Sequence, residues 1–406
     1  MRVLMLKAYY EPEIAAGIYL ASDLVEDMSK KGIYVDVYVP TPTRGISQEL
    51  RNKYKKEKKK EIKNQGKVII HRFPLWREST GSIGRAVRYV VQNIIETWIG
   101  ITKKYDVLLL GSTPPTNGVM GVIIKKIKRK RFVYVIDDLF PDSLVAARIT
   151  HKDSMIYRIG SWMERITYRN ADDIIVISKT MKQNLLEKNV PEKKIHVVYN
   201  WVDENAVKPV ERKDNTLFDE LKLDRERFYI TYAGNLGHSQ NIEVIVKAAE
   251  RLKDYDIHFL IFGEGSQKEK IQNLIKKKQL KNVELLPLKE YSRVSEVYSL
   301  GNASIVSCYP GTGQSALPSK TWSIMAAGKP VVASFDPNSE LEWILKKSGA
   351  GVFVEANNDK CLSEEILKLY KDSQRCKKMG EQARNFVQKN ISRSVCTEKY
   401  CRILKK

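Results

Sequence analysis

Short hydrophobic runs rich in β-branched residues alternate along the whole chain with stretches in which hydrophobic residues recur at helical spacing. Runs that are this continuously apolar are typical of strands buried on both faces, as in parallel sheets covered by helices. The pattern therefore predicts an α/β fold. The expected strands lie at 2–8, 35–40, 67–73, 106–111, 132–136, 172–178, 194–200, 228–234, 257–263, 283–288, 303–308, 329–334 and 350–354.

The alternation is interrupted once, at 201–227, where polar and charged residues prevail and no periodicity is clear. We interpret this segment as a linker between two doubly wound, Rossmann-like domains of similar size. The N-terminal domain is then 1–200 and the C-terminal domain 228–385. The last segment, 386–406, is expected to be a helix, and the sequence leaves open whether it crosses back to the first domain.

The net charge of the chain indicates what kind of partner it binds. The 406 residues include 70 Lys and Arg against 48 Asp and Glu, which gives a net charge of +22. Such an excess predicts a polyanionic neighbour, either nucleic acid, an anionic membrane surface or phosphate-bearing substrates. No window is apolar enough for a transmembrane helix. The five cysteines show no CxxC spacing, so we expect neither a zinc site nor a disulfide framework, and a reducing cytosol fits best.

Three basic clusters lie at 51–63, 125–131 and 276–281. Between the first two, residues 83–100 are predicted to form an amphipathic helix that carries Trp98. Solvated faces and a core-facing helix explain these features as well as attachment to a bilayer surface does, because a monotopic enzyme also uses basic, aromatic-bearing helices. The sequence leaves both interpretations open.

Loops at the carboxyl ends of parallel strands are where ligands bind in such sheets. After the first strand, an acidic loop with Glu13 ends at Gly17, at the start of a helix, where an anion or an ordinary turn fits equally. Hydroxyl groups follow the fourth strand at Ser112 and Thr113. After the fifth strand, Asp138 is a candidate to orient or deprotonate a hydroxyl nucleophile, with helix capping by the nearby carboxylates as the alternative.

The second half offers loops suited to a diphosphate. Glycines and small polar residues give backbone donors, and a lysine at the start of a helix gives one point cation. The candidates are Gly234, Asn235, Gly237 and His238 after the strand 228–234, Gly263 after the next strand, and Gly313, Ser315, Ser319 and Lys320 after 303–308.

Other chemistries fit poorly. Gly311-x-Gly313-x-x-Ala316 with Asp336 matches a dinucleotide fingerprint, but prolines bracket it and it follows a late strand, so we expect no nicotinamide cofactor. The chain has no GxSxG, no Walker A motif and no histidine pair with metal-ligand spacing. No DxD resembles a metal-dependent nucleotide-sugar site, so no metal is expected.

Several segments together resemble a known family. Residues 230–252, 261–271 and 315–334 are similar to the donor half of bacterial retaining GT-B glycosyltransferases of family 4. Residues 9–40 and 136–143 are similar to the acceptor half of its capsule, O-antigen and exopolysaccharide branch. The resemblance implies a GT-B fold, with two Rossmann-like domains facing each other across a cleft.

The resemblance also implies an activity. It favours transfer of an N-acetylated or deoxy hexose from a UDP-sugar to a lipid-diphosphate-linked saccharide, with retention, at the inner face of the plasma membrane. The UDP-sugar is then a co-substrate, and neither a cofactor nor nucleic acid takes part. The catalytic residues would be Asp138 and Lys320. Donor-binding residues would be Gly17, Gly234, Asn235, Gly237, His238, Gly263, Gly313, Ser315, Ser319, Lys320 and Glu340, and acceptor-binding residues Glu13, Ser112, Thr113 and Asp138.

The chain departs from the family pattern in two places. Asn235 and Gln240 stand where most members carry an arginine and a lysine, which leaves Lys320 as the principal cation. Ser315 and Ser323 stand where many members carry two glutamates. Two alternatives remain at this stage, a UDP-sugar epimerase on the same fold and a basic nucleic-acid-binding protein without enzymatic activity.

Overall fold

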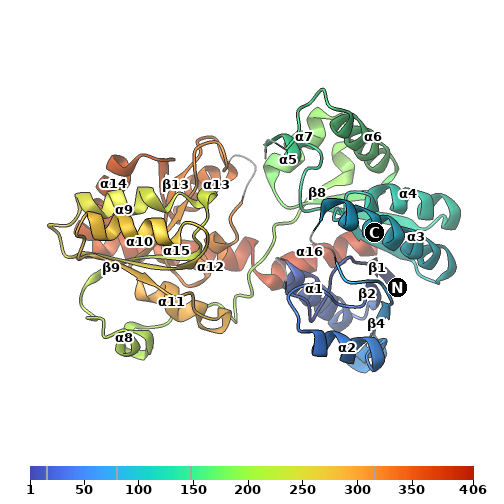
Figure 1. The fold of residues 1–406 in the computed structure, drawn as a ribbon, viewed down its shortest axis with the longest axis horizontal. Helices are drawn as coiled ribbons and strands as arrows, with labels where there is room; N and C mark the ends of the chain where they lie inside the picture. Colours follow the sequence, from blue (N-terminus) through green and yellow to red (C-terminus); the bar gives the residue numbers. More distant parts are fainter. Residues whose placement is uncertain (15–16, 79–80, 147–148, 314–316) are drawn as a thin grey trace. The chain divides into compact units, whose positions relative to one another are not determined.

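The computed structural model describes residues 1–14, 17–78, 81–146, 149–313 and 317–406. The chain divides into two compact units (Figure 1). Unit 1 comprises residues 1–199 together with 396–406, and unit 2 comprises residues 200–395. Each unit is an α/β body with its own sheet.

The sheet of unit 1 has eight strands in the order β3-β4-β2-β1-β5-β6-β7-β8. All neighbours are parallel except β3, which runs antiparallel to β4 at one edge. The strands are β1 (Arg2–Leu6), β2 (Tyr34–Pro40), β3 (Lys60–Lys63), β4 (Val68–Phe73), β5 (Val107–Gly111), β6 (Arg131–Ile136), β7 (Asp173–Val176) and β8 (Ile195–Val197). The central strands are buried on both faces, which explains their continuous apolar runs.

Helices cover this sheet and connect its strands. They are α1 (Ile18–Lys30), α2 (Gln48–Lys56), α3 (Ser82–Thr102), α4 (Asn117–Lys128), α5 (Asp142–Ala146), α6 (Met155–Asn170), α7 (Lys179–Glu187) and α16 (Arg393–Lys405), with short 3-10 turns at Asn64–Gly66 and Glu192–Lys194. Among the described residues, no helix is both long and apolar enough to cross a bilayer.

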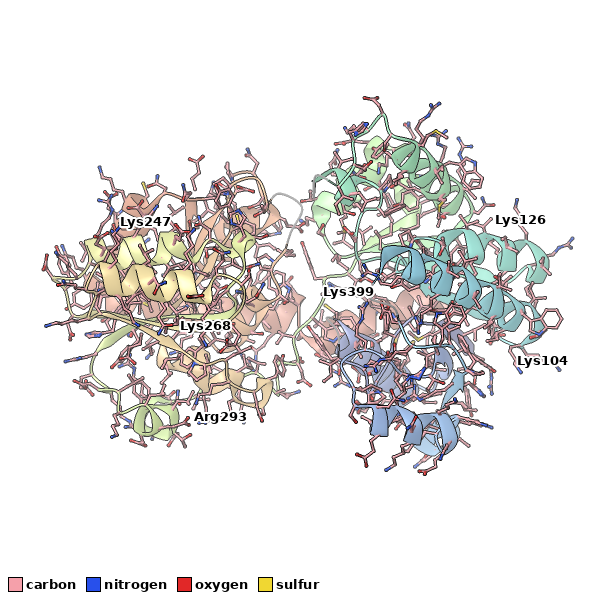
Figure 2. The ribbon with its side chains drawn as sticks, in the orientation of Figure 1. Lys104, Lys126, Lys247, Lys268, Arg293 and Lys399 are labelled. Carbon is pink, nitrogen blue, oxygen red and sulfur yellow. The ribbon has the colours of Figure 1, made fainter. Side chains whose placement is uncertain are left out.

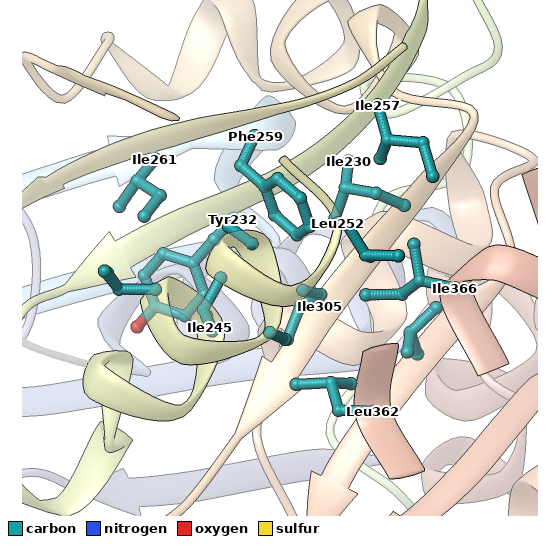
Figure 3. Packing of buried hydrophobic residues seen from close by; sticks show 14 of the residues in the cluster. Ile230, Tyr232, Ile245, Leu252, Ile257, Phe259, Ile261, Ile305, Leu362 and Ile366 are labelled. Atoms are coloured by element: carbon teal, nitrogen blue, oxygen red, sulfur yellow. The ribbon is translucent and has the colours of Figure 1, made fainter. Parts of the chain in front are cut away.

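Unit 2 is built on a six-stranded, fully parallel sheet in the order β11-β10-β9-β12-β13-β14. Its strands are β9 (Phe228–Asn235), β10 (Ile257–Glu264), β11 (Val283–Leu286), β12 (Ala303–Ser307), β13 (Val331–Phe335) and β14 (Gly351–Glu355). Figure 3 shows side chains of β9, β10 and β12 packed with those of two helices, among them Ile230, Phe259, Ile305, Ile245 and Ile366. Within this core, β9 and β12 are paired at Ile230 with Ala303 and at Thr231 with Ser304.

The helices of unit 2 are α8 (Leu217–Glu220), α9 (Ile242–Arg251), α10 (Lys268–Lys277), α11 (Val294–Leu300), α12 (Lys320–Ala326), α13 (Glu340–Ser348), α14 (Asp359–Lys371) and α15 (Ser373–Asn390). Short 3-10 turns lie at Arg212–Asp214, His238–Gln240 and Tyr291–Arg293.

Residues 201–227 were predicted to be a linker, but in the structure they pack as part of unit 2. The backbone N–H groups of Lys208 and Val210 donate to Ser295 Oγ (3.1 Å) and Ser299 Oγ (3.0 Å) of α11. Phe218 is fully buried. A few apolar side chains and hydroxyl partners on another helix therefore fix a segment whose own sequence is mostly polar.

The last residues of the chain return to unit 1. The Arg131 guanidinium, at the start of β6, donates to the carbonyls of Ile403 (2.6 Å) and Leu404 (3.0 Å). Thr397 Oγ1 donates to Asp27 on α1 (3.0 Å). The predicted C-terminal segment 386–406 is thus shared, since α15 belongs to unit 2 and residues 396–406 to unit 1.

Candidate functional site

Glycines bring the ends of β9 and β10 into close contact. Gly234 and Gly263 are paired across the two strands, and a Cβ added to Gly263 would lie 2.6 Å from the carbonyl oxygen of Gly234. Gly265 has φ +151°, and a Cβ there would lie 2.6 Å from Asn235 Oδ1. Gly234, Gly263 and Gly265 therefore have no room for a side chain, and they keep the backbone of the two strand ends close together at the carboxyl edge of the sheet.

Lys320 points at this bare backbone. Its Nζ donates to Tyr232 Oη (2.8 Å) and lies 3.9 Å from the centroid of that ring. A Cβ added to Gly234, which has φ +143°, would lie 2.7 Å from the same Nζ. Burial lowers the pKa of Lys320 to about 7. The structure thus places the predicted cation beside the predicted glycine, although 86 residues separate them in sequence.

If a nucleoside diphosphate such as UDP binds beside Lys320, the depressed pKa of this lysine makes the affinity dependent on pH. A diphosphate beside Nζ favours the protonated amine, so above its pKa the free protein must take up a proton in order to bind. We expect the affinity for UDP to fall by up to about tenfold per pH unit between pH 7 and 9. Titration calorimetry in buffers of different ionisation enthalpy measures both the affinity and the proton uptake. An affinity that stays constant over this range would contradict the prediction.

The loop after β9 joins a small polar cavity. Asn235 Nδ2 donates to Gln240 Oε1 (3.3 Å), and the rings of His238 and Tyr309 lie 4.7 Å apart. A cavity of about 190 Å³ opens beside this loop. Its lining includes Gly237, His238, Asn241, Glu243, Lys247, Gln267, Tyr309 and Asn357. Lys247 on α9 (Figure 2) is a cation that the sequence analysis missed, because it lies inside a helical pattern.

The glycine-rich loop after β12 is held by Asp336. The backbone N–H groups of Gly311 and Gly313 donate to its two carboxylate oxygens, at 2.8 Å and 2.7 Å. The carboxylate is therefore engaged in fixing the loop. Ser319 lies exposed just before α12, and Glu340 is buried at the start of α13. Ser315 lies outside the described residues.

In unit 1, Glu13 has a different role from the expected acceptor contact. Its carboxylate is buried and accepts hydrogen bonds from the backbone N–H groups of Thr43 (2.7 Å), Arg44 (3.0 Å) and Tyr10 (3.3 Å). It thus joins the loop after β1 to the loop after β2 and presents no free oxygen pair to an acceptor. Gly17 begins α1 in the left-handed region, at φ +76°, where glycine is favoured.

A second set of polar groups meets at the ends of β1, β5 and β6. Ser112 Oγ accepts a hydrogen bond from the backbone N–H of Asp137 (3.1 Å), and Asp138 follows with its side chain exposed. A Cβ added to Gly111 would lie 3.8 Å from both Lys7 Nζ and Asp137 Oδ2. Desolvation raises the pKa of Asp137, although the residue is partly exposed, and the charge of Lys7 opposes this effect.

Asp142 and Thr113 at this edge form hydrogen bonds within unit 1. Asp142 accepts hydrogen bonds from Lys188 (2.7 Å) and Tyr157 (2.8 Å), so it acts within the scaffold, and these bonds lower its pKa against the effect of burial. The carbonyl oxygen of Thr113 accepts from Asn117 Nδ2 (2.9 Å). Lys7 was missed because it ends an apolar run, yet a charge at the end of a buried strand was a usable signal.

Comparisons with known proteins give the same assignment for both halves. Residues 19–206 match the model of Glycosyltransferase Family 4, and residues 213–386 match that of Glycosyl transferases group 1. The chain is a glycosyltransferase, and its N-terminal half matches family 4. The family predicted from sequence is confirmed, whereas its branch and its retaining mode are not tested by these matches.

Relatives of this glycosyltransferase include the Escherichia coli (strain K12) putative colanic acid biosynthesis glycosyl transferase WcaI. It is 24% identical over 375 residues, which cover 89% of this chain and 90% of WcaI. The probable glycosyltransferase WbjE of Pseudomonas aeruginosa is 26% identical over 306 residues, covering 73% and 74%.

The fold has solved counterparts. The crystal structure of Anabaena Alr3699/HepE in complex with UDP matches over the full length of both chains, with a TM-score of 0.74 and 13% identity. The predicted GT-B fold is thereby confirmed. Among the described residues of the glycosyltransferase, no three His, Cys, Asp or Glu side chains are grouped as metal ligands. The need for a metal or cofactor stays untested.

Proposed function

We propose that this glycosyltransferase moves a sugar from a UDP-sugar to a lipid-diphosphate-linked saccharide, with retention of anomeric configuration, in the synthesis of a surface polysaccharide. The observation that carries the donor assignment is Lys320 Nζ against the bare backbone of Gly234. A compact cation next to glycine backbone is what a diphosphate leaving group requires. Further support comes from the relative named for colanic acid biosynthesis and the similar fold solved with UDP.

The chemistry needs little beyond charge stabilisation. The bond between the anomeric carbon and the diphosphate oxygen breaks, and the acceptor hydroxyl oxygen forms the new bond on the same face. The departing phosphate takes the acceptor proton, while Lys320 stabilises the negative charge that develops on it. Asp138 is proposed to orient the acceptor, because it is exposed at the carboxyl edge of the unit 1 sheet.

A lipid-linked acceptor lies in a membrane, and unit 1 has a face suited to binding a membrane surface. Helices α3, α4 and α6 pack side by side and expose apolar faces to solvent. Trp98 and Trp162 are 69% and 54% exposed. The remaining apolar side chains of this face, which we call the apolar face, are Val87, Val90, Ile94, Ile123, Ile127, Met155, Ile156 and Ile159.

Basic residues accompany the apolar face. Lys104 follows α3 and Lys126 lies on α4, both exposed (Figure 2), and α6 carries the exposed Arg158 and Arg165. Exposed aliphatic and tryptophan side chains with neighbouring cations suit an anionic bilayer surface. We therefore propose that this face docks on the membrane that holds the acceptor. The interpretation of 83–100 as a purely core-facing helix does not fit these exposed side chains.

A ligand panel tests the proposed function. UDP and UDP-sugars are expected to raise the unfolding midpoint of the full chain without added divalent metal, whereas NAD and NADP leave it unchanged. With a polyprenyl diphosphate-linked saccharide added, the product's anomeric configuration is read by NMR. Strict dependence on manganese, or stabilisation by NAD, would contradict the proposal. Conversion of the UDP-sugar to its epimer without any acceptor would instead assign an epimerase.

A further inference from the structure

Helix α3 turns a polar face toward the interior of unit 1, opposite its apolar face. Arg88, Gln92 and Glu96 recur every four residues along it, and all three are fully buried. Gln92 Nε2 donates to Glu96 Oε1 (2.8 Å), and burial raises the pKa of Glu96 to about 8. Glu96 Oε2 is nevertheless buried without a partner among the described residues, and the charge of Arg88 lowers the pKa of Glu96 against the effect of burial. Arg88 and Glu96 are therefore the two buried ionisable groups of this face.

Among the described residues, no carboxylate is hydrogen-bonded to Arg88. Its Nε donates to the carbonyl of Trp76 (3.2 Å), but Nη1 and Nη2 are buried and form no hydrogen bond with any described residue. A guanidinium group cannot lose its proton at any ordinary pH. A buried charge of this kind is strongly destabilising unless an anion compensates it.

Two more arginines gather around the same segment. Arg51 on α2 donates Nη2 to the carbonyl of Leu75 (3.0 Å), next to the Trp76 carbonyl that Arg88 contacts, and its Nε is also buried without a partner among the described residues. Burial, and then the charges of Arg77 and Arg88, lower the pKa of Arg51. Arg77 is exposed, so it lies on the side of the cluster that faces solvent.

The nearby carboxylates do not neutralise this cluster. Glu13 contributes one negative charge, but backbone N–H groups occupy its oxygens. Glu78 is engaged by Arg44, whose Nε and Nη2 donate to it at 3.2 Å and 2.8 Å, and by Tyr9. Three arginine charges against that of Glu13, and against that of Glu96 where it is ionised, leave a surplus of at least one positive charge.

We propose that Arg51, Arg77 and Arg88 form a binding site for the diphosphate of the acceptor. The site lies among the loops that follow β1, β2 and β4, at the carboxyl edge of the sheet where Lys7 and Asp137 also lie. Planar guanidinium forks match phosphate oxygens in geometry, and the surplus positive charge suits an anionic diphosphate. This inference rests on the proposed function, because it assigns the acceptor's charged group to unit 1.

The test uses the full chain with saturating UDP, so that the donor site is filled. Inorganic pyrophosphate and, separately, a polyprenyl diphosphate in detergent micelles are added, and the unfolding midpoint is followed. Arg88→Met is compared with Arg85→Met, which removes an exposed arginine of the same helix. Both ligands are expected to raise the midpoint of wild type and of Arg85→Met, and to bind Arg88→Met at least tenfold more weakly.

A ligand-free measurement separates this site from a structural role. Without diphosphate, the midpoint of Arg88→Met is expected to equal or exceed that of wild type, because an apolar side chain replaces an uncompensated buried charge. A lower midpoint together with an unchanged response to diphosphate would overturn the proposal. Should Arg88→Met not fold, Arg51→Gln provides the same comparison, with the same tenfold loss expected.

Two further outcomes are informative. A response to pyrophosphate without any response to the polyprenyl diphosphate would overturn the assignment to the acceptor. UDP binding to the variants, measured without diphosphate, is expected to match wild type. If wild type itself fails to bind UDP, the proposed function fails, while the difference between Arg88→Met and Arg85→Met still decides whether the arginine site exists.

Discussion

Replacing Lys320 with alanine is expected to weaken UDP binding by about 10- to 100-fold, as is typical for a lost charge-assisted hydrogen bond. Turnover should fall by at least the same factor, because the charge on the leaving phosphate grows as the bond breaks. The effect is large because Asn235 and Gln240 are uncharged where the family usually supplies two cations. Calorimetry below pH 7, where the amine is protonated, and a transfer assay measure the two losses.

The controls for Lys320 distinguish binding from folding. Lys320→Arg should retain part of the affinity, since a planar fork replaces a compact point charge in a site shaped by Gly234 and Tyr232. Lys277→Ala, at the exposed end of α10, should behave as wild type. The unfolding midpoint of Lys320→Ala without ligand should not decrease. Wild-type affinity and turnover in Lys320→Ala would mean that this lysine does not take part in binding the UDP-sugar.

Exchanging Trp98 and Trp162 together for alanine is expected to lower binding to anionic vesicles by about 100-fold. Each tryptophan buried at the bilayer surface contributes about 1.5 kcal/mol, and the two together about 3 kcal/mol. Transfer to a lipid-linked acceptor should decrease with vesicle binding, whereas UDP affinity should remain that of wild type. Vesicle flotation at two salt concentrations measures the binding and its electrostatic part.

A matched control for the apolar face is available in unit 2. Trp343→Ala removes a tryptophan that is 39% exposed on α13, and it should leave vesicle binding unchanged. Replacing the lysines at 55–60 by glutamine tests whether the first basic cluster adds electrostatic attraction. Binding that is independent of salt, of lipid charge and of both tryptophans would contradict membrane docking and would favour nucleic acid as the polyanionic partner.

The sheets could be predicted from the sequence because their strands are buried on both faces. Val3 to Leu6 and Leu108 to Leu110 form apolar runs without alternation, and both are core strands in the structure. Strand β3, Lys60–Lys63, was not predicted, since its charged sequence lies within the basic cluster 51–63. Charges suit an edge strand, where they oppose pairing with other chains, but they hide it from a search for hydrophobic runs.

The candidate site was predictable only in part. Glycines at strand ends and a lysine at a helix start are local signals, and the structure brings Gly234 and Lys320 together. The tasks of Glu13 and Asp336 depend on backbone donors 23 to 31 residues away, which sequence spacing does not reveal. The sequence also did not reveal that α3 buries its polar face and exposes its apolar face. Periodicity separates two faces of a helix, but it does not tell which one is buried.

The return of residues 396–406 to unit 1 sets an order for folding on the ribosome. Arg131 reaches its carbonyl partners at Ile403 and Leu404 only after all of unit 2 has been synthesised. Unit 2, by contrast, lies within one continuous stretch of chain and can fold as soon as that stretch has emerged. The half of the molecule that is made first is therefore completed last, so a nascent chain arrested before residue 396 would carry an unfinished unit 1.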